Sequence, residues 1–310
     1  MLPSLKVPAD QEIMASILAG RFLSGCLAIS GEMMPMAFSV DWLRVLALCT
    51  ENVKAHVQPL LRGLKEPQPE LGVGAGGDPM RLVDLAAEKA IVEVLLQHGV
   101  SFTLVSEESG IKEFGSDAQD CYVTVDPIDG TTNLVRGLPF YCSSIAVSRK
   151  PLLSEVYAGI VADLHHSTTY MAVAGDGAFR DGEKIAASAV ADLEEAVIGL
   201  DLNTLRVKEI TAQLTALIAR TKHIRHFGAN ALELCYVAEG LTDAFVDIRG
   251  KLRATDVAAG FLIVKEAGGV VTAPNGRPLD AKLDPQQRLK FVASGNRKIH
   301  GLILKLLKAK

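Results

Sequence analysis

The chain has 310 residues, enough for one large domain or two of ordinary size, and its 49% hydrophobic and 22% charged residues exclude extensive disorder. A formal net charge of −4, from 32 Lys and Arg against 36 Asp and Glu, gives no electrostatic support for sequence-independent binding to nucleic acid. The five cysteines lack the spacing of a zinc site or a disulfide framework, so we expect a reducing compartment, the cytoplasm.

The first 35 residues differ from the rest. Their apolar run at residues 13–20 is interrupted by Arg21 and is too short to cross a membrane. Leu23–Cys26 resembles the cleavage box of a bacterial lipoprotein, although acids precede the apolar run where a signal peptide is basic. We therefore expect residues 1–35 to be a dispensable extension, and we expect no membrane partner.

Helical and strand patterns mix along the remainder. Apolar spacing predicts helices at residues 40–62, 84–98, 205–220, 229–239 and 257–267, and a closing helix from residue 298. Apolar runs predict strands at residues 102–105, 122–125, 140–147, 155–162, 168–174, 196–202, 244–248 and 291–293. Because these elements do not alternate strictly, the pattern favours a layered, mixed α/β architecture. We place a division between residues 36–190 and 191–310.

Residues 72–79 read Gly-Val-Gly-Ala-Gly-Gly-Asp-Pro and formally match the dinucleotide-binding pattern G-x-G-x-x-G. The context differs, because a proline-rich stretch precedes the glycines where a strand is needed and Pro79 follows where a helix should start. The segment is more typical of a mobile loop than of a nicotinamide site. Asp84 comes next, at a position where its side chain would cap the following helix.

Acidic residues gather at predicted strand ends and helix starts. They are Asp84, Glu107, Glu108, Asp126, Asp129 and Asp256. Sites in folds of this class usually lie in the loops beyond strand ends, and acids gathered there repel one another unless a cation lies between them. Carboxylate oxygens without histidine or cysteine suit Mg²⁺ or Mn²⁺ rather than zinc.

The stretch Asp126-Pro-Ile-Asp129 combines turn-forming residues with two acids, and the carbonyl of Ile128 between them is a further oxygen ligand. Gly130-Thr131-Thr132 then begins a short predicted helix, whose free N–H groups are suited to a phosphate. Metal ligands beside a phosphate site indicate metal-assisted hydrolysis of a phosphate ester. Thr131 would orient the attacking water, with Asp84 as its acidic partner.

Three motifs resemble the inositol monophosphatase family, which belongs with the fructose-1,6-bisphosphatases among the lithium-sensitive, magnesium-dependent phosphatases. They are Val105-Ser-Glu-Glu-Ser-Gly110, Asp126-Pro-Ile-Asp-Gly-Thr-Thr-Asn133, and Thr255-Asp-Val-Ala-Ala-Gly260 with the following Glu266-Ala-Gly-Gly269. They occur in the family's order, and the resemblance covers residues 40–310. It implies a layered αβαβα sandwich, commonly a homodimer, with a metal- and phosphate-binding first half and a substrate-binding second half.

The resemblance implies a role for each matching position. Glu107, Asp126 and the Ile128 carbonyl would hold one metal ion, and Asp126, Asp129 and Asp256 a second. A third, weaker ion would lie near Glu107 through waters. Asp84 and Thr131 would activate the attacking water, with Glu107 also in the catalytic set. The Gly130 and Thr131 amides would bind the phosphate.

The substrate is less clearly indicated. Residues 133–141, 227–235 and 246–249 look closer to archaeal-type enzymes that accept both inositol monophosphate and fructose 1,6-bisphosphate. Asp247 and Asp129 would contact substrate hydroxyls, as would the positions of Ala229 and Asn230. The cations Arg136, Arg249, Lys251 and Arg253 would hold a second phosphate or form surface salt bridges.

Two departures from the family pattern bear on this choice. Thr255 replaces a tryptophan that often precedes the last metal-binding acid, which should alter packing more than metal binding. Ala229-Asn230 stands where small or hydroxyl-bearing residues usually contact the cyclitol, which weakens the case for inositol.

Two alternatives stay open. One is a phosphatase for 3′-phosphoadenosine 5′-phosphate or NADP, although such enzymes often carry Lys-Gly after Asp-Gly-Thr where Thr132-Asn133 stands here. The other is a binding protein that assists RNA polymerase or ribosome assembly. A pure binding protein does not need the complete set of acids, so the sequence favours an enzyme that acts on a phosphorylated small molecule.

Overall fold

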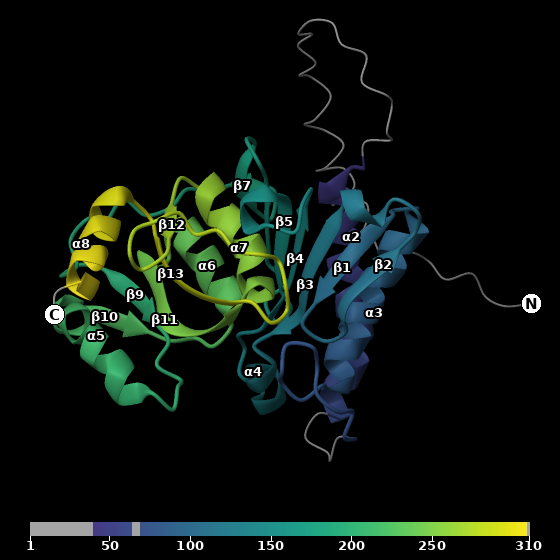
Figure 1. The fold of residues 1–310 in the computed structure, drawn as a ribbon, viewed down its shortest axis with the longest axis horizontal. Coiled ribbons are helices and arrows are strands. Elements are labelled where there is room, and N and C mark those ends of the chain that lie inside the picture. Colours follow the sequence, from purple (N-terminus) through teal and green to yellow (C-terminus); the bar gives the residue numbers. More distant parts are fainter. Residues whose placement is uncertain (1–39, 64–68, 309–310) are drawn as a thin grey trace, which may run out of the picture. The chain divides into compact units, whose positions relative to one another are not determined.

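The computed structural model describes residues 40–63 and 69–308. The extension predicted for residues 1–35 lies outside them. Two mixed sheets and the helices around them make up the described part of the chain (Figure 1).

The first sheet has eight strands in the order β2-β1-β3-β4-β5-β6-β7-β8. They are β1 (Phe102–Ser106), β2 (Gly110–Phe114), β3 (Tyr122–Asp129), β4 (Cys142–Ser148), β5 (Val156–Asp163), β6 (Thr169–Val173), β7 (Gly177–Arg180) and β8 (Glu183–Lys184). The β1–β3 pair is parallel, whereas the other neighbouring pairs are antiparallel. The two parallel strands therefore end at the same edge of the sheet.

The second sheet has five strands in the order β10-β9-β11-β13-β12. They are β9 (Val197–Leu200), β10 (His223–Arg225), β11 (Ala244–Arg253), β12 (Val270–Thr272) and β13 (Arg288–Ser294). Strand β9 runs parallel to β10 and β11, while β13 is antiparallel to β11 and β12.

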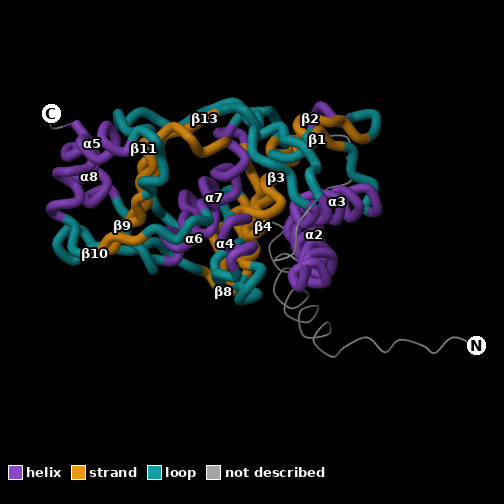
Figure 2. The backbone as a smooth tube through the Cα atoms, turned by 90° about the horizontal axis from the view of Figure 1, so that it is seen from below, coloured by secondary structure: helices purple, strands orange, loops and turns teal. Residues whose placement is uncertain are grey.

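Helices complete a five-layered arrangement (Figures 1 and 2). The helices α2 (Trp42–Val57) and α3 (Leu82–Gln97) cover the outer face of the first sheet, and α6 (Asn230–Glu239) and α7 (Ala254–Glu266) lie between the sheets. The helices α5 (Val207–Arg220) and α8 (Arg297–Lys308) cover the second sheet from outside. Short helical segments are η1 (Gln58–Gly63), η2 (Ala118–Asp120), η3 (Leu153–Glu155) and α4 (Thr131–Arg136). The predicted αβαβα sandwich is confirmed.

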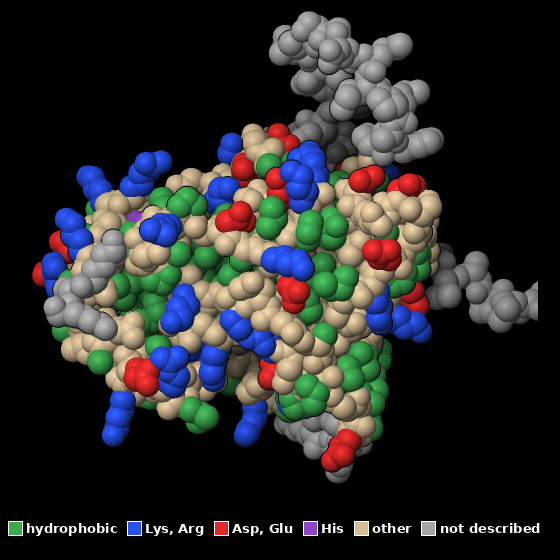
Figure 3. Space-filling model, in the orientation of Figure 1, with side chains coloured by type: hydrophobic (Ala, Val, Ile, Leu, Met, Phe, Trp, Pro, Cys, Tyr) green, Lys and Arg blue, Asp and Glu red, His purple; other side chains and the backbone are tan. Residues whose placement is uncertain are grey.

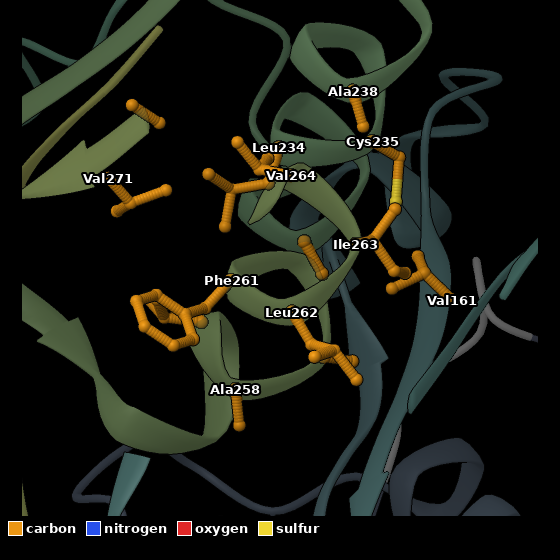
Figure 4. Close-up of a cluster of buried hydrophobic side chains, with 14 of the residues drawn as sticks. Val161, Leu234, Cys235, Ala238, Ala258, Phe261, Leu262, Ile263, Val264 and Val271 are labelled. Atoms are coloured by element: carbon orange, nitrogen blue, oxygen red, sulfur yellow. The ribbon is translucent and has the colours of Figure 1, made fainter. Parts of the chain in front are cut away.

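Helix α7 is buried on every side. Its residues from Ala254 to Val264 are all buried, as expected for a helix that is apolar around its whole circumference. Val264 lies beside Leu234 of α6 and points toward Val271 of β12, whereas Ile263 faces Val161 on the first sheet (Figure 4). Gly260 permits this packing, because a Cβ there would lie 2.7 Å from the Leu234 side chain. The helix thus joins the cores of both sheets.

The structure corrects several predicted boundaries. Strand β3 continues to Asp129 rather than ending at Val125, and β11 continues to Arg253 rather than ending at Ile248. Helix α7 begins at Ala254, three residues earlier than predicted. Asp84 lies in the first turn of α3 and does not cap it, since Arg81 occupies the N-cap position.

The short strands β2, β7, β8, β10 and β12 were not predicted. The predicted division near residue 190 falls in the connection between β8 and β9 and stays a prediction.

Candidate active site

A cavity of about 650 Å³ opens where the two sheets and α4 approach one another. It is lined by the glycine-rich segment before α3, the ends of β1 and β3, the start of α4, the segment after β9, and the β11–α7 junction. Lys and Arg side chains gather on the face of the molecule over β11 and β13, beside a hollow (Figure 3). The lining therefore combines an acidic end with cations contributed by the second sheet.

Three carboxylates form the centre of the acidic end. Oxygen atoms of Glu107, Asp126 and Asp256 all lie within 4.8 Å of one another. Asp126 and Asp256 are each 3% exposed, so water does little to screen their charges. Asp129 lies in the same cavity lining, where its carboxylate accepts a hydrogen bond of 2.6 Å from the backbone N–H of Ala231.

Local backbone geometry brings these acids together. Glu107 directly follows β1, and the parallel neighbour β3 carries Asp126 at the same edge, next to the paired residues Ser106 and Val125. In a regular strand, side chains three residues apart point to opposite faces. The β3–β4 register shifts by one residue between Asp126 and Asp129, and this bulge allows both carboxylates to line the cavity.

The α7 helix supplies the third acid of the cluster. Asp256 lies in its first turn and accepts a hydrogen bond of 3.0 Å from the backbone N–H of Arg253. A carboxylate at a helix N-terminus also interacts favourably with the helix dipole.

The raised pKa values of these acids show that it costs free energy to hold them ionised so close together. Burial, and then the charge of Asp256, raises the pKa of Glu107 to about 9. Burial, followed by the charges of neighbouring carboxylates, raises the pKa values of Asp126 and Asp129 well above their ordinary range. A bound cation would remove this repulsion, and a donor set of carboxylate oxygens fits Mg²⁺ or Mn²⁺. The predicted metal-binding residues are thus brought together, and their role as ligands stays a prediction.

Asp84 and Thr131 face the cavity beside this cluster. The Thr131 hydroxyl donates a hydrogen bond of 2.9 Å to the Ile128 carbonyl. Burial raises the pKa of Asp84 to about 7 and outweighs the opposing effects of the Arg81 charge and of Thr131. The Asp84 Oδ1 atom is buried and has no hydrogen-bond partner among the described residues. A buried acceptor of this kind requires a water molecule or an ion.

The start of α4 forms the next part of the lining. Gly130 is its N-cap and has a φ of 87°, which favours glycine. A Cβ at Gly130 would lie 3.0 Å from both the Ala229 Cβ and the Phe140 carbonyl oxygen. Gly130 and Thr131 both line the cavity, as the predicted phosphate site requires.

The opposite end of the cavity contains a compensated charge network. The Arg249 guanidinium is 4% exposed and forms ion pairs with Asp247 and, at 2.5 Å, with Asp201. His226 lies 3.6 Å from Asp201 and 3.7 Å from Glu233, and its pKa is raised chiefly by Glu233. Arg249 therefore has two buried partners and is no surface cation.

The predicted substrate residues fall into two groups. Asp129, Asn230, Arg249 and Arg253 line the cavity, whereas Ala229, Asp247 and Arg136 are not part of its lining. Asp247 and Ala229 are fully buried, and Arg136 is exposed at the end of α4.

Asp201, Asn203 and His226 also line the cavity but were not predicted as site residues. Asp201 directly follows β9, so the rule that identified the other acids, a position at a strand end, could have found it.

None of the helices within residues 40–63 and 69–308 has the length and apolar character needed to cross a membrane.

Comparisons with known proteins agree with this site. Residues 43–310 match the model of the inositol monophosphatase family. The chain is 36% identical over 274 residues to a fructose-1,6-bisphosphatase/inositol-1-monophosphatase of Methanothermobacter thermautotrophicus, covering 86% of this chain and 96% of that one. It is 32% identical to a bifunctional NADP phosphatase/NAD kinase of Methanococcus maripaludis, covering 84% of this chain but 48% of that protein. A crystal structure of an inositol monophosphatase-fructose 1,6 bisphosphatase superposes with a TM-score of 0.75 at 29% identity, covering 86% and 99% of the two chains.

Proposed function

The chain belongs to the inositol monophosphatase family and is a phosphatase, and from this we propose that it is a phosphomonoesterase that requires Mg²⁺ or Mn²⁺ and hydrolyses inositol monophosphate, fructose 1,6-bisphosphate or both. The observation that carries the proposal is the convergence of Glu107, Asp126 and Asp256 within 4.8 Å, beside Asp84 and Thr131. A structural role alone would not favour buried carboxylates that repel one another.

We assign the metal ions to Glu107, Asp126, Asp129, Asp256 and the Ile128 carbonyl. When bound, they would polarise the phosphoryl group and stabilise charge on the leaving oxygen.

The residues beside them orient and deprotonate the attacking water. Because the Thr131 hydroxyl donates to the Ile128 carbonyl, its oxygen is available to accept a hydrogen bond from that water. The Asp84 Oδ1 atom has no hydrogen-bond partner in the described part of the chain, and the pKa of this side chain is raised to about 7, so Asp84 is suited to take the proton near neutral pH. The Gly130 and Thr131 amides would bind the phosphate.

For a bisphosphate, we propose that Lys251, Arg81 and Arg288 are the available cations. All three line the cavity, and none of them forms an ion pair with another described residue. Arg249 and Arg253 are already paired with carboxylates, and Arg136 is not part of the lining. The ion pairs of Arg249 with Asp201 and Asp247 would then determine the shape of the cavity where the substrate binds.

NADP is a second candidate substrate. It is favoured by the 32% identity to the bifunctional NADP phosphatase/NAD kinase, whose other half has no counterpart in the matched region. We further propose, from the family resemblance, a homodimer that acts in the cytoplasm; sedimentation of the purified protein would test the dimer.

A phosphate-release panel at fixed Mg²⁺ tests the function. It compares inositol 1-phosphate, fructose 1,6-bisphosphate, NADP and 3′-phosphoadenosine 5′-phosphate, each with and without chelator. We expect chelator-sensitive release from one of the first two substrates to exceed release from the nucleotides. Faster release from NADP would replace the proposed substrate, and release that is insensitive to chelator would overturn the metal-dependent mechanism.

A further inference from the structure

The glycine loop, residues 72–79, connects the two sheets at the acidic end of the cavity. On one side, the amides of Ala75 and Gly76 donate hydrogen bonds of 3.0 Å and 2.7 Å to the carbonyl oxygens of Glu108 and Glu107. On the other side, the Gly76 carbonyl accepts hydrogen bonds of 3.1 Å from Arg253 and 2.6 Å from Arg288. Two arginines from the second sheet therefore hold a loop that rests on the first.

The loop approaches these partners so closely that a side chain would not fit. A Cβ at Gly76 would lie 2.6 Å from the Arg253 Nε atom and 2.8 Å from the Glu107 Cγ atom. Gly76 is buried, whereas its neighbours Gly77 and Asp78 are exposed. The position of the loop is thus tied to the positions of Arg253 and Glu107.

Arg253 reaches from the loop into the acid cluster. Its guanidinium is 12% exposed and pairs with Asp78 of the loop, with Glu107 at 2.9 Å and with Asp256 at 3.9 Å. Arg288 donates hydrogen bonds to the carbonyl oxygens of Gly76 and Pro285 and forms no ion pair with a described acid, although its charge opposes the rise that burial causes in the pKa of Asp256. The two arginines share the loop contact, while Arg253 alone of the two pairs with the cluster.

We propose that Arg253 is a positioning residue that competes with the divalent cation for Glu107 and Asp256, and so links metal binding to the placement of the glycine loop. The inference rests on the proposed metal site. A guanidinium and a divalent cation that share two carboxylates repel each other, so each weakens the binding of the other. Metal binding then withdraws Glu107 from Arg253 and loosens the loop that both residues hold.

Mn²⁺ titration of the purified apo protein, followed by calorimetry, tests the competition. We expect Arg253→Gln to bind Mn²⁺ about five- to tenfold more tightly than the unmodified protein, because a competing charge is removed. Arg253→Lys retains the charge and should stay within about twofold. Arg288→Gln removes a charge that acts on Asp256 without an ion pair, so it should tighten Mn²⁺ binding less than Arg253→Gln does. Unchanged or weaker Mn²⁺ binding by Arg253→Gln would overturn the proposal.

Hydrogen–deuterium exchange of residues 72–79 tests the link to the loop. In the unmodified protein, saturating Mn²⁺ should speed exchange in this segment, whereas Arg253→Gln should exchange rapidly with or without Mn²⁺. Arg288→Gln should exchange faster than the unmodified protein and still respond to Mn²⁺. A loop that does not respond to Mn²⁺ in the unmodified protein would refute the link. If Mn²⁺ fails to bind the unmodified protein at all, the proposed metal site itself is wrong.

Discussion

The two ends of the cavity contain buried carboxylates in contrasting states. At one end, Glu107, Asp126 and Asp256 face one another with Arg253 as the paired cation, and their pKa values are raised. At the other end, Asp201 and Asp247 flank the Arg249 guanidinium, which opposes the rise that burial causes in the pKa of Asp247. Buried charges are stable when they are paired and costly when they are not. The first end is therefore suited to bind a further cation. The second end already contains the Arg249 guanidinium, so its ion pairs can determine the shape of the cavity there.

The largest expected effect comes from Asp126→Asn. The change removes a charge shared by both proposed metal positions, so we expect phosphate release to fall by at least about 10³-fold. Far-ultraviolet circular dichroism should be unchanged, and the chelated variant should melt no lower than the chelated unmodified protein because repulsion is relieved. Asp120→Asn, an exposed acid on η2, is the matched control. Undiminished turnover in Asp126→Asn would refute the assignment.

Arg249→Met should destabilise the folded protein by removing the cation that pairs with Asp201 and Asp247. Asp201 and Asp247 would be left buried without their cation, and breaking a buried pair typically costs about 3–5 kcal/mol. Urea denaturation should detect this loss, and Arg136→Met, at an exposed position on α4, should change stability by less than about 0.5 kcal/mol. Equal stabilities for the two variants would mean that the network does not hold this end together.

Thr131→Val should separate orientation of the water from metal binding. We expect kcat to fall about 10²-fold, because the hydroxyl that would position the water is lost while the carboxylates remain. Mn²⁺ affinity should stay within about twofold. Thr131→Ser keeps the hydroxyl and should retain most of the activity. Weakened Mn²⁺ binding in Thr131→Val would assign the residue to the metal site instead.

The stability of the chelated protein should depend on pH. The folded-state pKa values of Asp84, Glu107 and Glu108 are raised to about 7, 9 and 8, so these groups bind protons more tightly in the folded protein. Their contribution is fully present below the unfolded pKa, near about 4, and is lost as the pH rises through the folded values. The chelated protein should therefore melt at lower temperature at pH 9 than at pH 5.

Adding Mg²⁺ should flatten this dependence, because the cation favours the ionised carboxylates. Calorimetric melts at both pH values, with and without Mg²⁺, measure it. A chelated protein whose melting temperature rises between pH 5 and pH 9 would contradict the inferred charge state of the acidic end.

The sequence predicted the layered fold and the residues of the acidic end because both depend on local patterns. An acid at the end of an apolar run can be recognised from the sequence as a candidate site residue, as Glu107 can after β1. The predicted end of β3 was wrong for a physical reason. Proline is unfavourable in a central strand, but the bulge accommodates Pro127.

The ion pairs of Arg249 with Asp201 and Asp247 could not be predicted as a group, because the local sequence pattern does not show which distant residues meet. Asp201 meets Arg249 across 48 positions of the sequence, and this pairing follows from the parallel alignment of β9 with β11. Likewise, Arg253 was expected near a phosphate or a surface acid, and only the folded chain brings it to Asp78, Glu107 and Asp256. Such long-range contacts require the strand order, which the sequence did not reveal.

Helix α7 has a consequence for how the protein can be divided. It completes the hydrophobic cover of the first sheet, although it lies more than 60 residues after β8 in the chain. A fragment of residues 36–190 would leave that face exposed to water, and a fragment of residues 191–310 would contain α7 without the surface it packs on. We therefore expect neither fragment to fold alone and the two sheets to melt in one cooperative transition, so that the acids gathered from both are assembled together or not at all.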